Sequence, residues 1–354
     1  INKILVSSRK KIADYLSARA QEIIFTDGGT ETNNLAIRGI VSYWRSENNG
    51  KKPHIITSKI EHASVLETVK LLEQAGEISA TYLSVNSHGI VDVKELKESI
   101  RENTLLISIG YVNGEIGVIQ DIKNIAKTIR HYRKHHNSVL PYFHTDAIQA
   151  VNYLDINVQK LGVDAMTINS SKIYGPKKIA VLYKKDVIKI NPIITGGNQE
   201  HALRAGTENI PYIIGLAESL SYVRGIKEYE YKRLLELQKY TAEKLAQHLD
   251  IDFIINGIES ERVPNIVNIS IPLLSSEEII LRLDAVGVKA SVKSACKSRE
   301  QGDSHVIRAL RTDNTQSIRF SFGQGTKKSD IDYMIEKLVT ITNSMKKTHD
   351  SYLT

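Results

Sequence analysis

The sequence contains a single cysteine, Cys296, among its 354 residues. One thiol excludes an internal disulfide and a metal site built from several cysteines, and it indicates a reducing compartment. No apolar run of about 18 residues is present, so the sequence predicts no membrane-spanning helix. The chain opens without a basic and apolar leader. We therefore expect a cytoplasmic protein, or one of an organelle matrix after processing, that has no membrane partner.

Proline and glycine are also scarce, with 7 and 21 residues, while 41% of the chain is hydrophobic and 25% is charged. This composition is typical of a globular protein with one large or two medium domains. Lys and Arg exceed Asp and Glu by 47 to 40, but many of the lysines fall in amphipathic segments, 229–249 and 327–347. Because no arginine-rich run or aromatic RNA-binding motif accompanies the charge, we expect no nucleic-acid partner.

Short β-rich runs alternate with helical periodicity from Glu22 onward. The expected strands lie at 23–25, 54–56, 104–109, 142–144, 165–167 and 179–183, and the expected helices at 33–44, 64–74 and 122–135. Such alternation predicts an α/β fold with a mainly parallel sheet. A long helical stretch then changes the rhythm, so we expect a large domain over 1–214 and a smaller α/β domain over 215–354.

The segment 25–34, Phe-Thr-Asp-Gly-Gly-Thr-Glu-Thr-Asn-Asn, places glycines and hydroxyls between a strand and a helix start. The free N–H groups of a helix N-terminus favour a phosphate. The alternative is an ordinary helix cap formed by Thr30 with Asn33.

Two further residues follow predicted strands. Lys172 precedes a Gly-Pro turn and could form a Schiff base, or it could be one of many solvated lysines. Asp146 ends an apolar run, where a carboxylate could pair with a pyridinium nitrogen or merely cap a helix.

His62 and Cys296 each have two interpretations. His62 could stack on a ring and transfer protons, or begin a helix with its side chain in solvent. Cys296 lies in a small and polar stretch between Lys293 and Lys297, which favours an exposed thiol inclined toward thiolate. The alternative is an incidental surface thiol.

In order and spacing, these segments together resemble the cysteine desulfurases of the class-V aminotransferase superfamily, which are pyridoxal-phosphate enzymes. The resemblance covers nearly the whole chain, at 26–34, 61–62, 112–117, 144–149, 171–177, 196–200, 204–209, 294–296 and 317–321. It implies a fold-type I transferase, whose large domain has a seven-stranded sheet.

The resemblance also implies a role for each matching residue. Lys172 resembles the Schiff-base lysine, Asp146 the pyridinium partner, and His62 the ring-stacking acid/base. Gln149 resembles the donor to the phenolic oxygen of the ring, and Arg319 the clamp for the substrate carboxylate. The implied phosphate site comprises Gly29, Thr30, Asn169, Ser171 and, from the second subunit of a homodimer, Thr207.

The implied reaction converts L-cysteine to L-alanine and leaves a persulfide on Cys296, which passes sulfur to an acceptor or iron–sulfur scaffold protein. Two alternatives are another class-V lyase or aminotransferase and a degenerate scaffold without catalysis. The Ser-Ala-Cys context of Cys296 favours the desulfurase.

Five departures from the family pattern stand out. Ser171 and Asn169 replace a His and a Ser, and both can still donate hydrogen bonds to phosphate. Gly114 replaces an Asn near the ring, and Asp27 replaces a Ser and adds negative charge near the phosphate. An Asp-Asn-Ala-Ala-Thr-Thr stretch that the family carries beside the cofactor is not among these residues.

Overall fold

A computed structural model of the chain describes residues 2–272, 274–292, 304–310 and 316–353. By its internal contacts the chain forms two compact units. The larger unit comprises Ile1–Ser84, Val91–Val112 and Gln120–Lys227, and the smaller unit comprises Val85–Ile90, Asn113–Ile119 and Glu228–Thr354.

The larger unit is built on a seven-stranded sheet with the order β1-β7-β6-β5-β4-β2-β3. Its strands are β1 (Ile23–Thr26), β2 (His54–Ser58), β3 (Ser79–Leu83), β4 (Thr104–Ser108), β5 (Tyr142–Asp146), β6 (Ala165–Asn169) and β7 (Ala180–Lys184). The pairs from β3 to β6 are parallel, whereas β7 runs antiparallel to both β6 and β1. Strands β1, β2, β4, β5 and β6 therefore all end at the same edge of the sheet.

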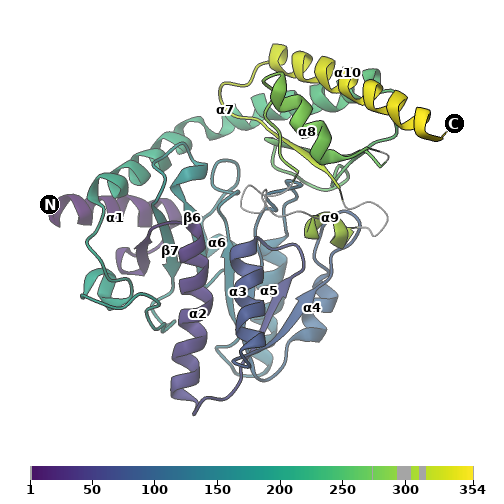
Figure 1. Ribbon diagram of the computed structural model, residues 1–354. Helices are drawn as coiled ribbons and strands as arrows, with labels where there is room; N and C mark the ends of the chain where they lie inside the picture. The colour runs from purple at the N-terminus through teal and green to yellow at the C-terminus, as the bar shows by residue number, and fades with distance from the viewer. Residues whose placement is uncertain (1, 273, 293–303, 311–315, 354) are drawn as a thin grey trace. The chain divides into compact units, whose positions relative to one another are not determined.

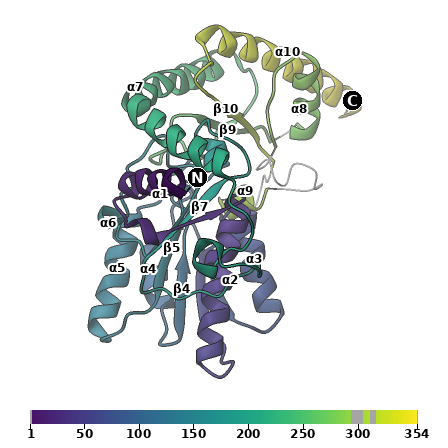
Figure 2. The same ribbon diagram turned by 90° about the vertical axis from the view of Figure 1, so that its left-hand side faces the viewer.

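Helices cover both faces of this sheet, and in Figure 2 α2 and α5 lie on opposite sides of the strands. The helices of the larger unit are α1 (Asn2–Leu16), α2 (Gly29–Glu47), α3 (Ala63–Gln74), α4 (Val93–Ser99), α5 (Ile122–His135) and α6 (Val158–Leu161). Three short 3-10 helices are η1 (Ala20–Glu22), η2 (Ser170–Lys172) and η3 (Gln199–Ala202).

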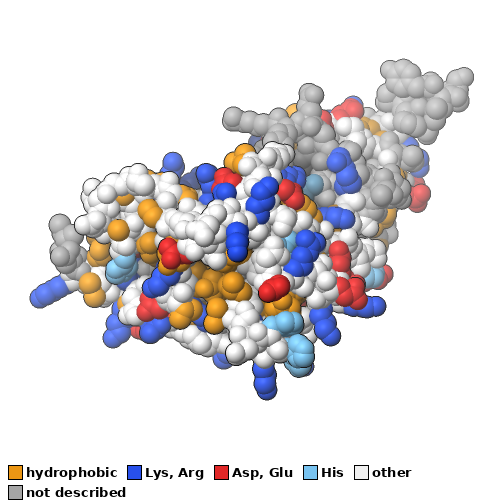
Figure 3. Space-filling view, turned by 90° about the horizontal axis from the view of Figure 1, so that it is seen from below, with side chains coloured by type: hydrophobic (Ala, Val, Ile, Leu, Met, Phe, Trp, Pro, Cys, Tyr) orange, Lys and Arg blue, Asp and Glu red, His pale blue; other side chains and the backbone are white. Residues whose placement is uncertain are grey.

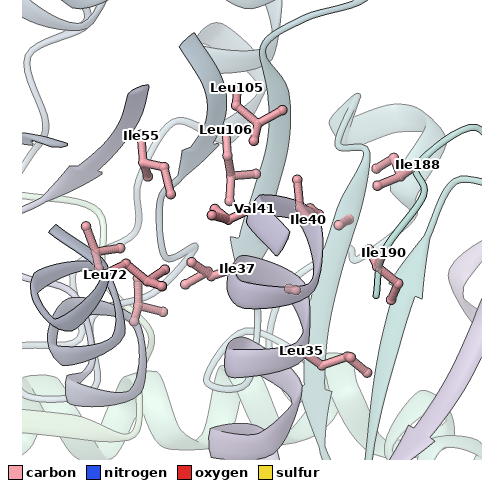
Figure 4. Close-up of a cluster of buried hydrophobic side chains, with 14 of the residues drawn as sticks. Leu35, Ile37, Ile40, Val41, Ile55, Leu72, Leu105, Leu106, Ile188 and Ile190 are labelled. Carbon is pink, nitrogen blue, oxygen red and sulfur yellow. The ribbon is translucent and has the colours of Figure 1, made fainter. Parts of the chain in front are cut away.

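The core beneath α2 holds that helix in place. Ile37, Ile40 and Val41 project from α2 toward Ile55 and Leu106 of the sheet (Figure 4). All five side chains are at most 2% exposed. Because each such burial contributes about 1.5–3 kcal/mol, the position of α2 over the sheet is strongly determined.

The smaller unit has a three-stranded antiparallel sheet with the order β10-β9-β8. Its strands are β8 (Ile254–Ile255), β9 (Ile266–Ser270) and β10 (Ile318–Ser321), and its helices are α8 (Ser276–Ala285), α9 (His305–Leu310) and α10 (Lys328–Leu353). Helix α7 (Ile210–His248) belongs to both units (Figure 1).

The expected α/β architecture with a mostly parallel seven-stranded sheet and a smaller domain is confirmed. We expected a domain boundary at 214/215. Along the chain, the larger unit ends at Lys227 and the smaller unit continues from Glu228. This point lies inside α7, where an unbroken helix gives no change in periodicity. Strand β3 was not predicted, because its first four residues are only half-buried and its composition is weakly β-forming.

On the face seen in Figure 3, Lys and Arg side chains alternate with acidic, apolar and neutral polar groups. This distribution agrees with solvated helix faces. Within the described part of the chain, no helix is long and apolar enough to cross a membrane.

Candidate active site

The predicted site residues of the larger unit gather where the strands end. Asp146 is the last residue of β5, Asn169 is the last residue of β6, and Lys172 follows in η2. His62 follows β2, and Gly29 opens α2 after β1. Ligands of open α/β sheets bind at this edge, because the connections there leave a crevice.

Asp146 is held by both of its carboxylate oxygens. Oδ2 accepts a hydrogen bond of 2.8 Å from Asn33 Nδ2, and Oδ1 accepts one of 3.0 Å from the N–H of Ile148. The residues after Asp146 form a turn rather than a helix, so Asp146 does not cap a helix. Its Oδ1 instead accepts the hydrogen bond that begins this turn. The carboxylate is 9% exposed and has a fixed orientation.

His62 begins α3, as the alternative interpretation expected, but its ring is half-buried rather than fully in solvent. Its Nδ1 accepts a hydrogen bond of 3.1 Å from the N–H of Ser64 and lies 2.7 Å from Ser64 Oγ. The ring is therefore anchored to the first turn of its own helix.

The amino end of α2 lacks the cap that we considered. Among the described residues, no side chain caps this helix, and its N-cap position is Gly28. Thr30 is exposed, and Asn33 faces Asp146 instead. A helix of 19 residues with an uncapped N-terminus retains donor groups and the positive end of its dipole for an anion.

Gly29 brings this N-terminus close to two neighbours. A Cβ at Gly29 would lie 2.3 Å from Ile148 Cδ1 and 3.3 Å from Asn169 Nδ2. A larger residue here would have to displace the end of the Ile148 side chain, and the close approach places the start of α2 beside Asn169, three residues before Lys172. Two predicted members of the phosphate site, Gly29 and Asn169, therefore lie side by side.

The backbone around Lys172 is tightly fixed. Asn169 Oδ1 accepts a 3.0 Å hydrogen bond from the N–H of Ser171, and the carbonyl of Lys172 accepts one from Asn152 Nδ2. A Cβ at Gly175 would lie 2.1 Å from Ser170 Oγ and 3.1 Å from Ser219 Cβ, so a side chain at position 175 would require these serines to move. Lys172 and Ser171 are exposed at this turn.

The negative charge of Asp27 is matched by an arginine. Arg204 lies 2.8 Å from Asp27 Oδ1 and 2.9 Å from Glu31 Oε1. We expected Asp27 to add negative charge near a phosphate, and the one positive charge of Arg204, shared with Glu31, offsets part of it. Through its ion pair with Glu31, Arg204 also connects the segment before Thr207 with the first turn of α2.

The segment before Thr207 is held at a second point. Glu200 is buried with φ of 49°, where a non-glycine residue is strained. Its carboxylate accepts hydrogen bonds from Arg9 at 2.5 and 2.8 Å and from the N–H of Phe25 at 2.9 Å. These bonds hold the strained turn in place, and Thr207 is exposed beyond it. Gln149 is half-buried in the turn after Asp146.

The remaining predicted residues belong to the C-terminal part of the sequence. Arg319 lies in β10, and its Nη1 donates a 2.8 Å hydrogen bond to the carbonyl of Gly114, within the smaller unit. Gly114 thus contributes a backbone acceptor at the position where we noted the loss of a side chain. Cys296 lies outside the described residues.

Sequence reasoning missed three polar residues of this site, namely Asn33, Glu61 and Ser64. Asn33 shares the buried face of α2 with Ala36, Ile37 and Ile40. A lone amide on an otherwise apolar helix face is a signal that could have identified it.

Glu61 joins the ends of two strands. Its carboxyl group accepts hydrogen bonds from Ser58 Oγ at 2.6 Å and from the N–H of Gly110 at 3.0 Å. Burial, with a smaller contribution from the charge of Asp146, raises the pKa of Glu61 from 4.5 to about 7 against the lowering effect of these hydrogen bonds.

We predict that Glu61→Gln changes how stability depends on pH. Between pH 4.5 and 7 the unfolded chain ionises Glu61 while the folded chain keeps it protonated. The wild-type free energy of unfolding should therefore fall, relative to Glu61→Gln, by up to about 3 kcal/mol across this range. Urea unfolding at pH 5 and pH 7.5 measures the difference. Glu67→Gln, at an exposed position of α3, is the control. An equal difference at both pH values for Glu61→Gln would show that Glu61 ionises normally.

Comparison with known proteins identifies the family. The aminotransferase class-V family pattern matches residues 1–334. The cysteine desulfurase IscS of Dictyoglomus turgidum is 41% identical over 342 residues, which cover 96% of this chain and 84% of that protein.

Two solved structures agree with this assignment. A NifS-like protein has a TM-score of 0.85 at 28% identity, covering 97% of this chain and 88% of its own. A structure described as SspA in complex with cysteine has a TM-score of 0.74 at 32% identity, covering 90% and 86%. The chain therefore belongs to the class-V aminotransferase family, within its cysteine desulfurases.

Proposed function

We propose that this chain is a pyridoxal-phosphate-dependent cysteine desulfurase that removes sulfur from L-cysteine and carries it on Cys296. The observation that supports this most strongly is the convergence at the strand ends of the oriented Asp146 carboxylate, the uncapped start of α2 and the Lys172 turn. The similarity to proteins named cysteine desulfurase supports the choice of reaction.

The residues present fit the cofactor chemically. The start of α2, with Gly29 against Asn169, offers a cradle for a phosphate, and Thr30 and Ser171 lie exposed beside it. Asp146, fixed by Asn33, suits a protonated pyridine nitrogen, and Gln149 in the next turn suits the phenolic oxygen. When bound, pyridoxal phosphate supplies an electron sink for the α-carbon of an amino acid.

The protein's own residues would perform the remaining tasks. Lys172 would hold the cofactor covalently and yield its place to the amino group of the substrate. Arg319 would bind the substrate carboxylate, since a guanidinium can bond both of its oxygens. His62 would contact the ring and move a proton.

Sulfur would move by attack of the Cys296 thiolate on the substrate sulfur. A sulfur–sulfur bond forms, the carbon–sulfur bond breaks, and its electron pair remains with the β-carbon, which takes up a proton. Cysteine and a thiol thus become alanine and a persulfide without an external oxidant. A sulfur acceptor or iron–sulfur scaffold protein would then receive the sulfur.

We propose the cytoplasm as the location, because a lone catalytic thiol needs a reducing compartment.

The test is incubation of purified protein with pyridoxal phosphate, L-cysteine and a reductant, with quantification of products. We expect alanine and sulfide in equal amounts. Pyruvate and ammonia instead of alanine would identify a lyase of the same family, and the absence of turnover with bound cofactor would identify a non-catalytic scaffold.

We further propose a homodimer in which Thr207 of one subunit completes the phosphate site of the other. Arg204 and Glu200 anchor the segment before Thr207 to the start of α2 and to β1, which supports a fixed position for Thr207. We predict that Thr207→Ala remains dimeric in sedimentation but binds pyridoxal phosphate about 10-fold more weakly, as expected for loss of a hydrogen bond to a charged group. A monomer that binds the cofactor as tightly as a dimer would refute the shared site.

A further inference from the structure

We propose that Asn33 is a positioning residue that orients Asp146 and, through Ser64, fixes the His62 ring with its proton on Nε2. The catalytic meaning of this inference rests on the proposed function. The hydrogen bonds themselves do not.

Asn33 connects two parts of the site that are far apart in sequence. Its side chain is fully buried in α2, and Nδ2 donates hydrogen bonds of 2.8 Å to both Asp146 Oδ2 and Ser64 Oγ. Because a carboxylate oxygen only accepts, the amide nitrogen must face Asp146. Chemistry therefore determines which way the amide points.

Ser64 continues the chain of donors to the histidine. Its Oγ accepts from Asn33, and its own hydroxyl hydrogen can reach His62 Nδ1 at 2.7 Å. The backbone N–H of Ser64 also donates to Nδ1, at 3.1 Å. A backbone N–H can never accept, so Nδ1 must be the accepting nitrogen, and a neutral His62 carries its proton on Nε2.

The cost of this arrangement indicates function rather than stability. Asn33 interrupts a buried apolar helix face, and its Oδ1 finds no hydrogen-bond partner in the described part of the chain. Burying an unpaired amide oxygen is unfavourable, and a leucine would avoid that penalty. The two donor bonds of Nδ2 give a reason for an asparagine at this position.

One consequence concerns what the ring can offer at its second nitrogen. In the Nε2–H tautomer a neutral His62 donates a hydrogen bond from Nε2 and cannot accept a proton there. Asp146 and His62 are also linked through Asn33 and Ser64, three hydrogen bonds in series. A change at Asn33 should therefore disturb both groups, whereas a change at Ser64 should disturb His62 more than Asp146.

The first arm of the test uses the full chain without cofactor, labelled with 15N-histidine. Long-range proton–nitrogen correlations identify the tautomer of each ring, and the signals lost in His62→Asn assign His62. We expect the Nε2–H tautomer. A proton on Nδ1 of His62 in the wild-type chain would overturn the inference. This result needs no bound cofactor, and the His62→Asn variant serves only to assign the signals.

The second arm compares Asn33→Ala, Ser64→Ala and the matched control Asn34→Ala. Asn34 is the next residue of α2, and its Nδ2 donates only to the Thr30 carbonyl among the bonds that we observe. We expect Asn33→Ala to bind pyridoxal phosphate about 10-fold more weakly, because Asp146 loses a charge-assisted bond. Ser64→Ala should lose about 2-fold in affinity but shift the Nδ1 resonance of His62, and Asn34→Ala should resemble the wild type.

Equal affinities for Asn33→Ala and Asn34→Ala would overturn the positioning role. Asn33→Asp has the same shape without the donor, so it serves if the alanine variant fails to fold. If the wild type itself does not bind pyridoxal phosphate, the proposed function fails while the tautomer result still decides the inference.

Discussion

Lys172→Ala is expected to lower alanine formation from cysteine at least about 1000-fold, because the chain loses the amine that binds the cofactor covalently. The visible absorption of the attached cofactor should disappear, and borohydride treatment should no longer fix the cofactor to the protein. The turn around Lys172 is held by Asn169 and Asn152, so the backbone should keep its conformation in the variant. Circular dichroism and cofactor absorbance together measure this outcome.

Lys177→Ala is the matched control for this variant. Lys177 is an exposed lysine of the same turn, directly after Gly175-Pro176, and its replacement should leave activity and colour near the wild-type values. Peptide mapping of borohydride-treated wild type should find the cofactor on Lys172. A cofactor on Lys177, or on no lysine, would show that Lys172 is wrongly assigned.

Cys296→Ser is expected to abolish sulfur transfer, again by at least about 1000-fold, while cofactor binding and colour persist. A serine hydroxyl cannot replace a thiolate as the nucleophile toward sulfur. Since Cys296 is the only cysteine of the chain, alkylation of wild-type protein should inactivate it at one label per subunit. Sulfide release and thiol labelling are the measurements.

Ser294→Ala, two residues away in the same polar stretch, is the control and should retain sulfur transfer. Undiminished sulfide release by Cys296→Ser would remove the thiol from the mechanism. It would then favour a lyase reaction at the same cofactor.

Much of the fold was predictable from local sequence. The sequence predicted strands at 54–56 and 104–109, and the structure has them at His54–Ser58 and Thr104–Ser108. A strand that is buried on both faces is a short, nearly continuous apolar run, which local sequence reveals. The same local rules failed for β3, whose first four residues are only half-buried. The transition between the units at Lys227 and Glu228 falls inside the continuous helix α7, where the periodicity does not change.

The candidate site was predictable only in part. Residues such as Asp146 and His62 could be predicted because they lie at the end of a strand or the start of a helix. What escaped prediction are pairings between distant residues. Asn33 and Asp146 are 113 positions apart, and Arg204 and Glu31 are 173 apart. Local periodicity says nothing about such pairs. It could identify Asn33 as an unusual residue on an apolar face, but it could not name its partner.

A single turnover without reductant decides whether Cys296 receives the sulfur of cysteine. Purified protein carrying pyridoxal phosphate is mixed with one equivalent of L-cysteine, and intact mass, peptide mapping and free alanine are determined together. The proposed function predicts a mass increase of one sulfur atom, located on Cys296, matched by one alanine per modified subunit. Bound cofactor and consumed cysteine without added sulfur on Cys296 would contradict it.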